Sequence, residues 1–115
     1  MDSAMSLLVV LVTAPDEAQA QSMAETLLKE RLVACVQILP GLASHYWWQG
    51  QLERSAEVLM ILKAREQTWS ELEQRVRVLH PFDVPQIVAL PASHVESHYA
   101  QWVNEVTGAD SEAGE

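Results

Sequence analysis

The stretch from Arg31 to Ala64, RLVACVQILPGLASHYWWQGQLERSAEVLMILKA, decides the fold of this 115-residue chain. Two runs rich in β-branched and aromatic residues flank one turn signal, Gln49-Gly50. Such residues favour a pleated, half-buried surface, and a glycine supplies the positive φ of a tight hairpin turn. Pro40-Gly41 interrupts the first run, and because proline has no N–H for a ladder, this pair predicts a bulge, a bend or an edge position. The stretch therefore predicts a long, bent β-hairpin whose tip overshoots the body of the domain.

The residues before the hairpin predict a strand and a helix. Residues 7–12 (LLVVLV) form a continuous apolar run that is typical of a central strand. Asp16, with Gln19 three positions later, matches a capping box, and the apolar residues that follow recur at helical spacing. We expect a helix from about residue 16 to residue 31.

The residues after the hairpin predict two more helices around a strand. Thr68 with Glu71, and Ser93 with Glu96, match capping boxes. The first of these helices ends at His80-Pro81, because a residue before proline is disfavoured in the α region. Residues 86–90 (QIVAL) form the strand between them. The predicted apolar face of the last helix comprises Tyr99, Trp102, Val103 and Val106, with Gly108 as its C-terminal cap.

The predicted element order is β-α-β-β-α-β plus a C-terminal helix, which is an α+β, ferredoxin-like arrangement with helices on one face of one sheet. We assign residues 1–6 to an N-terminal extension, residues 7–108 to a single domain, and residues 109–115 to a disordered acidic tail. The strands lack the apolar-polar alternation of a sheet with one face in water. Other copies of the same chain are the simplest cover for the second face, so we expect self-association.

Composition excludes several classes of function. Seven basic and sixteen acidic residues give a net charge of −9, which argues against nucleic acid as a partner. A single cysteine, Cys35, fits a reducing compartment, and no targeting or membrane-spanning segment is visible, so we expect a cytoplasmic protein that is not membrane-bound. The sequence shows no nucleophile constellation, glycine-rich phosphate loop or paired-cysteine metal motif, so we do not expect an enzyme or a required cofactor.

Several short motifs, in one order and spacing, resemble the CutA family of divalent-cation tolerance proteins. The matching segments are Thr13-Ala14-Pro15-Asp16, Arg31–Val36, Ile38–Gly41, Ser44-x-Tyr46-x-Trp48-x-Gly50, Glu57, Leu62-Lys63, His80-Pro81-Phe82, Pro85-x-Ile87-x-Ala89-Leu90-Pro91 and Tyr99-x-x-Trp102. The resemblance implies a ferredoxin-like homotrimer, similar in fold and assembly to the PII signalling proteins, with a role in the response to metal ions.

The resemblance also implies a copper site. In the family, the proposed ligands are a cysteine just before Thr-Ala-Pro and a His-His pair before the proline. This chain carries Val12 and Leu79 at two of those positions and keeps His80. Copper or another divalent cation is therefore expected to bind weakly, through His80 or through Cys35.

Each candidate ligand has a structural alternative. Cys35 has apolar neighbours and also fits a small buried hydrophobe, whereas His80 also fits a favourable charge at a helix end. His94 and His98 are four residues apart and share a helix face if their helix begins early enough.

A second group of candidates is predicted near a cleft between subunits. Glu57 and Lys63 lie on one face of a strand, Asp16 at a helix start and Asp83 in the loop PFDVP. They bind an anion, a metal or a small ligand, or they form a salt bridge between subunits. The aromatic run Tyr46–Trp48 either stacks on a ligand or anchors the interface.

Two functions remain open from the sequence. The first is a trimeric divalent-cation tolerance protein that binds metal weakly or indirectly. The second is a PII-like sensor or scaffold whose subunit clefts bind a small ligand or an unknown partner protein.

Overall fold

The computed structural model describes residues 6–108. The elements are β1 (Leu7–Ala14), α1 (Glu17–Lys29), β2 (Cys35–Trp48), β3 (Gln51–Arg65), the short 3₁₀ turn η2 (Glu66–Thr68), α2 (Trp69–Leu79), β4 (Ile87–Pro91) and α3 (Ser97–Val106). Ser6 belongs to the domain, because its carbonyl accepts a hydrogen bond from the backbone N–H of Glu66 at 2.9 Å. The rest of the predicted N-terminal extension and the predicted acidic tail, residues 109–115, lie outside the described residues.

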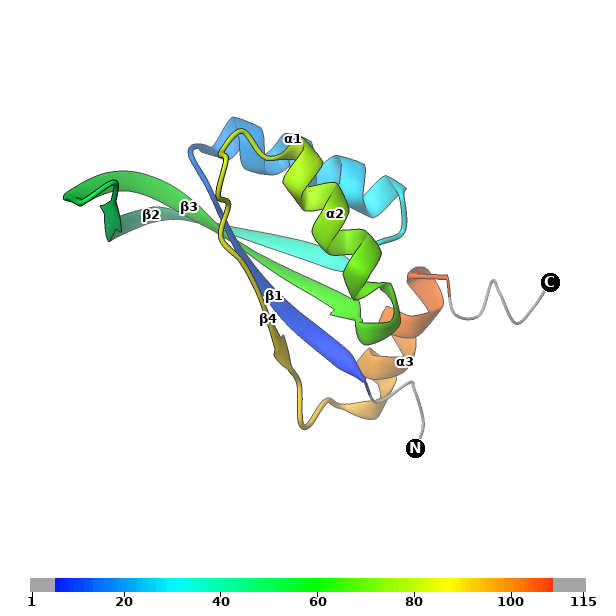
Figure 1. Ribbon diagram of the computed structural model, residues 1–115. Helices are drawn as coiled ribbons and strands as arrows, with labels where there is room; N and C mark the ends of the chain where they lie inside the picture. The colour runs from blue at the N-terminus through cyan, green and yellow to red at the C-terminus, as the bar shows by residue number, and fades with distance from the viewer. Residues whose placement is uncertain (1–5, 109–115) are drawn as a thin grey trace.

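The four strands form one antiparallel sheet in the order β2-β3-β1-β4. The apolar strand β1 lies inside the sheet between β3 and β4, as predicted, and the long strands β2 and β3 extend beyond it as a curved hairpin (Figure 1). This order, with helices α1 and α2 packed on one face, confirms the ferredoxin-like α+β fold. Pro91 is the last residue of β4 and pairs with Leu8; it is tolerated there because β4 is an edge strand.

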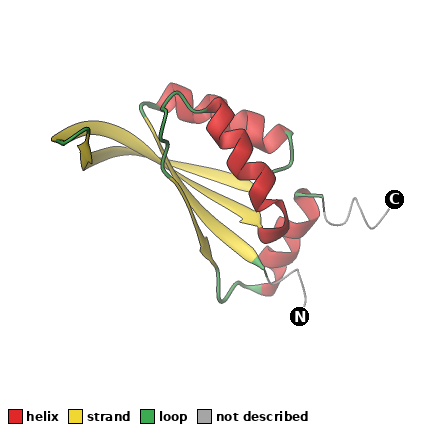
Figure 2. Cartoon of the chain, in the orientation of Figure 1, coloured by secondary structure: helices red, strands yellow, loops and turns green. Residues whose placement is uncertain are grey.

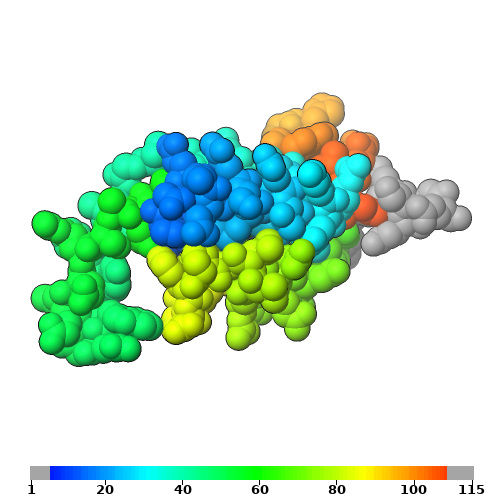
Figure 3. All heavy atoms as spheres, turned by 90° about the horizontal axis from the view of Figure 1, so that it is seen from above, coloured from blue at the N-terminus to red at the C-terminus, as the bar shows by residue number. Residues whose placement is uncertain are grey.

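The main core lies between the sheet and the helices α1 and α2 (Figure 2). These two helices lie side by side, and the hairpin stands away from them (Figure 3). Alternate residues of the strands point into this core because successive side chains of a strand face opposite sides. The buried core residues from the strands are Leu8, Val10, Val12, Ala14, Val58, Met60, Leu62 and Ala64, and those from the helices are Ala20, Met23, Ala24, Leu27, Leu72 and Val76.

The opposite face of the sheet is only partly covered. Helix α3 covers one end of it, where Ala100 and Val103 pack with Leu7 and Ala34. The remainder, here called the open face, presents half-buried and exposed apolar side chains, namely Val9, Leu11, Leu39, Leu59, Ile61, Val88 and Leu90. Leu39 is 56% exposed, Val88 46% and Leu90 48%. The prediction that the strands are apolar on both faces is therefore confirmed.

Helix α3 is held on the sheet by its C-terminus. The buried guanidinium of Arg65 donates from Nε to the hydroxyl of Thr107 and from a terminal nitrogen to the Thr107 carbonyl, both at 2.9 Å. The guanidinium of Arg31 donates to the Val106 carbonyl at 3.1 Å. These bonds satisfy carbonyls that a helix end leaves without partners, and they place positive charge at the negative end of the helix dipole.

The hairpin has the predicted turn and the predicted bulge. Gln49 (φ 51°) and Gly50 (φ 79°) both have positive φ, as a two-residue type I′ turn requires. The pairing of β2 with β3 shifts between Leu39 and Leu42, across the Pro40-Gly41 pair. The bend of the hairpin therefore arises from a bulge at the position that the sequence indicated.

Of the three predicted N-terminal caps, only the one at Asp16 is confirmed. Asp16 caps α1 by accepting the Gln19 N–H at 2.8 Å. The prediction for Thr68 is wrong, because its hydroxyl donates back to the Arg65 carbonyl. The prediction for Ser93 is also wrong, since α3 begins at Ser97 and Glu96 is its N-cap, accepting the Tyr99 N–H at 2.9 Å.

The predicted apolar face of α3 is only partly correct. Val103 is buried as predicted, but Tyr99 and Trp102 are exposed, and the helix instead buries Ala100 and Asn104. Because α3 begins only at Ser97, its side facing the sheet carries Ala100. The larger rings of Tyr99 and Trp102 lie beside that contact.

Candidate functional site

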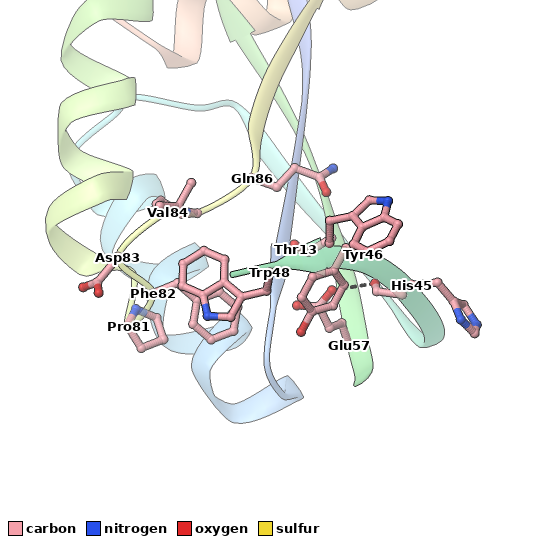
Figure 4. Close-up of a pocket in the computed structure, with 13 residues that line it drawn as sticks. Thr13, His45, Tyr46, Trp48, Glu57, Pro81, Phe82, Asp83, Val84 and Gln86 are labelled. Carbon is pink, nitrogen blue, oxygen red and sulfur yellow. Dashed lines mark hydrogen bonds between the residues drawn. The ribbon is translucent and has the colours of Figure 1, made fainter. Parts of the chain in front are cut away.

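One pocket of about 740 Å³ lies between the hairpin and the loop that joins α2 to β4 (Figure 4). Its walls combine aromatic, acidic and small polar residues from parts of the chain far apart in sequence. The lining residues are Thr13 from β1, Ser44, His45, Tyr46, Trp47 and Trp48 from β2, Glu57 from β3, and Pro81, Phe82, Asp83, Val84, Pro85 and Gln86 from the loop. A cavity of this size fits a small molecule rather than a single ion.

The bulge in β2 determines which side chains of the hairpin share a face. Before the bulge Leu39 pairs with Leu59, and after it Leu42 pairs with Glu57. Two residues of β3 thus correspond to three of β2, so the alternation of β2 side chains is reversed beyond the bulge. Ser44, Tyr46 and Trp48 consequently lie on the same face as Glu57.

The carboxylate of Glu57 is held by its neighbour on this face. The hydroxyl of Ser44 donates to Oε1 of Glu57 at 2.5 Å, and both residues are half-buried. Two residues further toward the tip on each strand, the hydroxyls of Tyr46 and Ser55 form a hydrogen bond of 3.3 Å. These two bonds fix a carboxylate and an aromatic ring in the hairpin wall of the pocket.

His80 supports the loop that forms the other wall of the pocket. Its ring is buried, and the Phe82 backbone N–H donates to Nδ1 at 3.1 Å. Nδ1 therefore carries no proton in this arrangement, and Nε2 donates to the Thr13 carbonyl at 2.7 Å. The Phe82 ring lies against the imidazole with the centroids 4.9 Å apart. His80 thus connects the loop to the end of β1.

Cys35 lies outside the pocket, in a small polar cluster on the open face. Its Sγ lies 3.4 Å from the Tyr99 hydroxyl, and the thiol is half-buried. Lys63, the strand partner of Cys35, places its ammonium 5.8 Å from the centre of the Tyr99 ring and donates to the Gln37 side chain at 3.1 Å. Partial burial of the phenol, followed by the hydrogen bond and charge interaction with Cys35, raises the pKa of Tyr99 to about 12.

Comparison with known proteins decides the family. The sequence model of the CutA1 divalent ion tolerance protein family matches residues 8–106. The chain belongs to this CutA family. The divalent-cation tolerance protein CutA of Thermus thermophilus is 45% identical over 100 residues, covering 87% of this chain and 97% of the relative. The CutA of Pyrococcus horikoshii is 43% identical over 101 residues, covering 88% and 98%.

Solved structures of family members have the same fold. The Thermus thermophilus CutA1 structure gives a TM-score of 0.86 at 44% identity, covering 89% of this chain and 99% of that one. The CutA1 structure from Oryza sativa gives a TM-score of 0.87 at 35% identity, covering 91% and 96%. The family resemblance of the sequence motifs and the predicted fold are therefore both confirmed.

At the positions where the family resemblance implied copper ligands, this chain carries groups that do not face an open coordination site. Val12 is buried in the core, and Leu79 packs against the same core. Both ring nitrogens of His80 already have hydrogen-bond partners. His80 and Cys35 do not converge either, since Thr13 pairs with Leu59 and Cys35 with Lys63, four residues further along β3.

His94 and His98 do not share a helix face. The prediction for His94 and His98 fails because His94 precedes α3, where its Nδ1 lies 3.3 Å from the Ser93 hydroxyl. The Nδ1 of His98 instead pairs with Glu96 at 2.8 Å. Within residues 6–108, no three histidine, cysteine, aspartate or glutamate side chains cluster in a way that would hold a metal ion.

The structure brings together four of the six residues predicted for a cleft. Tyr46, Trp48, Glu57 and Asp83 line the pocket. Asp16 caps α1 and Lys63 lies in the Cys35 cluster, so neither lines it. The sequence did not indicate Thr13, Ser44, Val84 or Gln86 as lining residues. The prolines of PFDVP did identify residues 81–85 as a loop.

Proposed function

We propose that this CutA-family chain functions in the cytoplasm as a homotrimer, and that it supports divalent-cation tolerance without a resident copper centre. The open face is the observation that supports the proposed trimer. Apolar side chains from all four strands remain uncovered by α3 there. A contiguous apolar surface of this kind is the usual signature of a protein interface. In the described part of the chain, no helix is long and apolar enough to cross a membrane.

The proposed cellular location follows from cysteine use. The chain has one cysteine and therefore no internal disulfide, which suits a reducing compartment. A CutA from Archaeoglobus fulgidus, 32% identical in the aligned structures, is described as periplasmic. The location that we propose for this chain therefore differs from the one in that relative's description.

Copper binding by this chain is proposed to be weak. A tight copper site needs several nitrogen or sulfur ligands in fixed geometry. His80 has both nitrogens engaged, and Cys35 offers a thiol without a second soft ligand among the residues of its cluster. We propose a binding rather than a catalytic role, in which metal acts indirectly or at low affinity.

A second candidate function is a PII-like sensor or scaffold that binds a small ligand or a partner protein. The pocket favours this alternative, because Glu57 and Thr13 belong to the strand positions of the open face. In a trimer that buries the open face, the pocket would lie at the border between subunits. The two candidates are compatible, since a ligand sensor can regulate metal tolerance without binding the metal.

Native mass spectrometry of protein purified without added metal or chelator tests this proposal. We expect three copies of the 12.8 kDa chain and no stoichiometric copper. Calorimetric titration with Cu²⁺ should then give weak binding in the parent chain and in His80→Asn. A stable monomer would contradict the assembly. Tight copper binding that disappears in Cys35→Ser would contradict the absence of a copper centre.

A further inference from the structure

The pocket between the hairpin and the residue 81–86 loop has the lining of a receptor for a charged organic molecule. We propose that it binds an organic cation with an apolar body, such as a quaternary ammonium compound or a protonated amine. This inference deepens the small-ligand candidate described above and rests on it. Three independent properties of the pocket carry the inference: its aromatic walls, its charge and its size.

The aromatic walls suit a cation. Tyr46 and Trp48 come from the hairpin, and Phe82 comes from the loop (Figure 4). The face of an aromatic ring is negative, so it attracts a cation placed over it, most strongly for tryptophan. In the single chain Trp48 is 43% exposed and Phe82 42%, so each ring has surface that is not packed against its own chain.

The charge of the lining selects the sign of the ligand. Glu57 and Asp83 contribute carboxylates, and His45 and Tyr46 are the other titratable groups. No lysine or arginine is among the described residues that line the pocket. A phosphate or carboxylate ligand would therefore meet repulsion from Glu57 with no basic partner, whereas a cation gains from that carboxylate. The net charge of −9 adds a field of the same sign.

The size of the pocket separates an organic cation from a metal ion. A cavity of about 740 Å³ is far larger than a single hydrated metal ion requires. A metal also needs several converging ligands, and the described residues contain no such group. The apolar lining residues Pro81, Val84 and Pro85 provide contact for the rest of an organic ligand.

The recognition groups are held in place before a ligand arrives. The hydroxyl of Ser44 fixes the Glu57 carboxylate, and Ser55 bonds to the Tyr46 hydroxyl. Phe82 is held by its backbone bond to His80 and by the contact between the two rings. Because these side chains are already ordered, binding would cost less conformational entropy than in a mobile loop.

Calorimetric titration with choline and with its uncharged isostere, 3,3-dimethylbutan-1-ol, tests the proposal. The two probes have nearly the same shape, so a difference in affinity reports the charge. We expect choline to bind with 1:1 stoichiometry per chain and about tenfold more tightly than the isostere. Adenosine triphosphate serves as an anionic probe, for which we expect no binding.

Variants locate the binding site. Glu57→Gln keeps the shape and an oxygen that accepts from Ser44, and it should weaken choline binding about fivefold or more without affecting the isostere. Phe82→Leu should weaken binding through loss of an aromatic wall. Glu25→Gln, an exposed position on α1 outside the pocket lining, is the control for net charge and should leave binding unchanged.

The outcomes separate this inference from the proposed function. Equal affinity for choline and its isostere, binding of the nucleotide instead, or an equal effect of Glu25→Gln and Glu57→Gln would overturn the cation site. So would the absence of choline binding in a sample that sediments as a folded trimer. A folded monomer that binds choline would contradict only the proposed assembly, because all the lining residues belong to one chain.

Discussion

The neighbours of Tyr99 on the open face determine the pKa of its hydroxyl. Its ring contacts Trp102, with the centroids 5.6 Å apart, and lies beneath the ammonium of Lys63. Its hydroxyl meets the Cys35 thiol at 3.4 Å. Partial burial disfavours the phenolate, and the bond with Cys35 adds to this effect, so the pKa of Tyr99 rises from its usual 10.0 to about 12.

This pKa can be measured directly because the chain has only two tyrosines. In a Tyr46→Phe variant, the phenolate absorbance of Tyr99 should have its midpoint near pH 12. Adding Cys35→Ala should lower that midpoint, but it should stay above 10 because partial burial is the larger cause. A midpoint near 10 in the Tyr46→Phe variant would refute the arrangement around Tyr99.

The same shift predicts a pH dependence of stability. Between pH 10 and 12 the unfolded tyrosine has lost its proton while the folded one retains it, so the folded state binds more protons. The contribution of Tyr99 is therefore complete below pH 10 and is lost as the pH rises to about 12. The Tyr99→Phe variant, compared by chemical unfolding across this range, should lose less stability than the parent chain.

At the same scale, His80 illustrates what the sequence could not supply. Its position before Pro81 identified it as a helix end and as a candidate ligand. Whether an imidazole has a free lone pair depends on which backbone groups face it. Those partners, Thr13 and Phe82, become visible only when β1 and the loop are placed together.

Helices and strands were predicted well where a pattern is periodic, and less well at their ends. The hairpin turn and its bulge followed from Gln49-Gly50 and Pro40-Gly41, because glycine and proline restrict the backbone locally. The capping boxes at Thr68 and Ser93 failed because a hydroxyl near a helix start has several partners within reach: Thr68 bonds to the Arg65 carbonyl and Ser93 to the His94 side chain. Tertiary contacts choose among those partners, and the sequence pattern does not.

The difference between a true cap and a sequence match is testable. Asp16→Ala removes the acceptor for the Gln19 N–H and should lower the free energy of unfolding by about 1 kcal/mol. Ser93→Ala removes no cap and should stay within about 0.5 kcal/mol of the parent chain. Both variants are compared by denaturant unfolding at one protein concentration. Equal effects would show that Ser93 caps α3 after all.

For the whole molecule, the sequence predicted the layers of the fold but not the pocket. The apolar periodicities and the capping and turn residues were enough for the element order, the central position of β1 and the apolar second face. The pocket depends on the register of β2 against β3 and on the path of the residue 81–86 loop. Register is a long-range property, and a one-residue bulge reverses the face on which Tyr46 and Trp48 lie.

If the trimer is held together through the open face, a single charged substitution on that face should dissociate it. Val88 pairs with Leu11 on this face, is 46% exposed in the single chain, and lies outside the core beneath α1 and α2. Val88→Asp should therefore leave the monomer fold intact but place a charge in the interface, at a cost of several kcal/mol. Analytical ultracentrifugation should show dissociation of the trimer.

Val78→Asp is the matched control for this prediction. Val78 is 73% exposed on α2, on the opposite side of the sheet, so the same charge there should leave the trimer intact. Circular dichroism of each variant checks that the fold persists. If Val88→Asp sediments like Val78→Asp, as a trimer, then the subunits associate through a surface other than the open face.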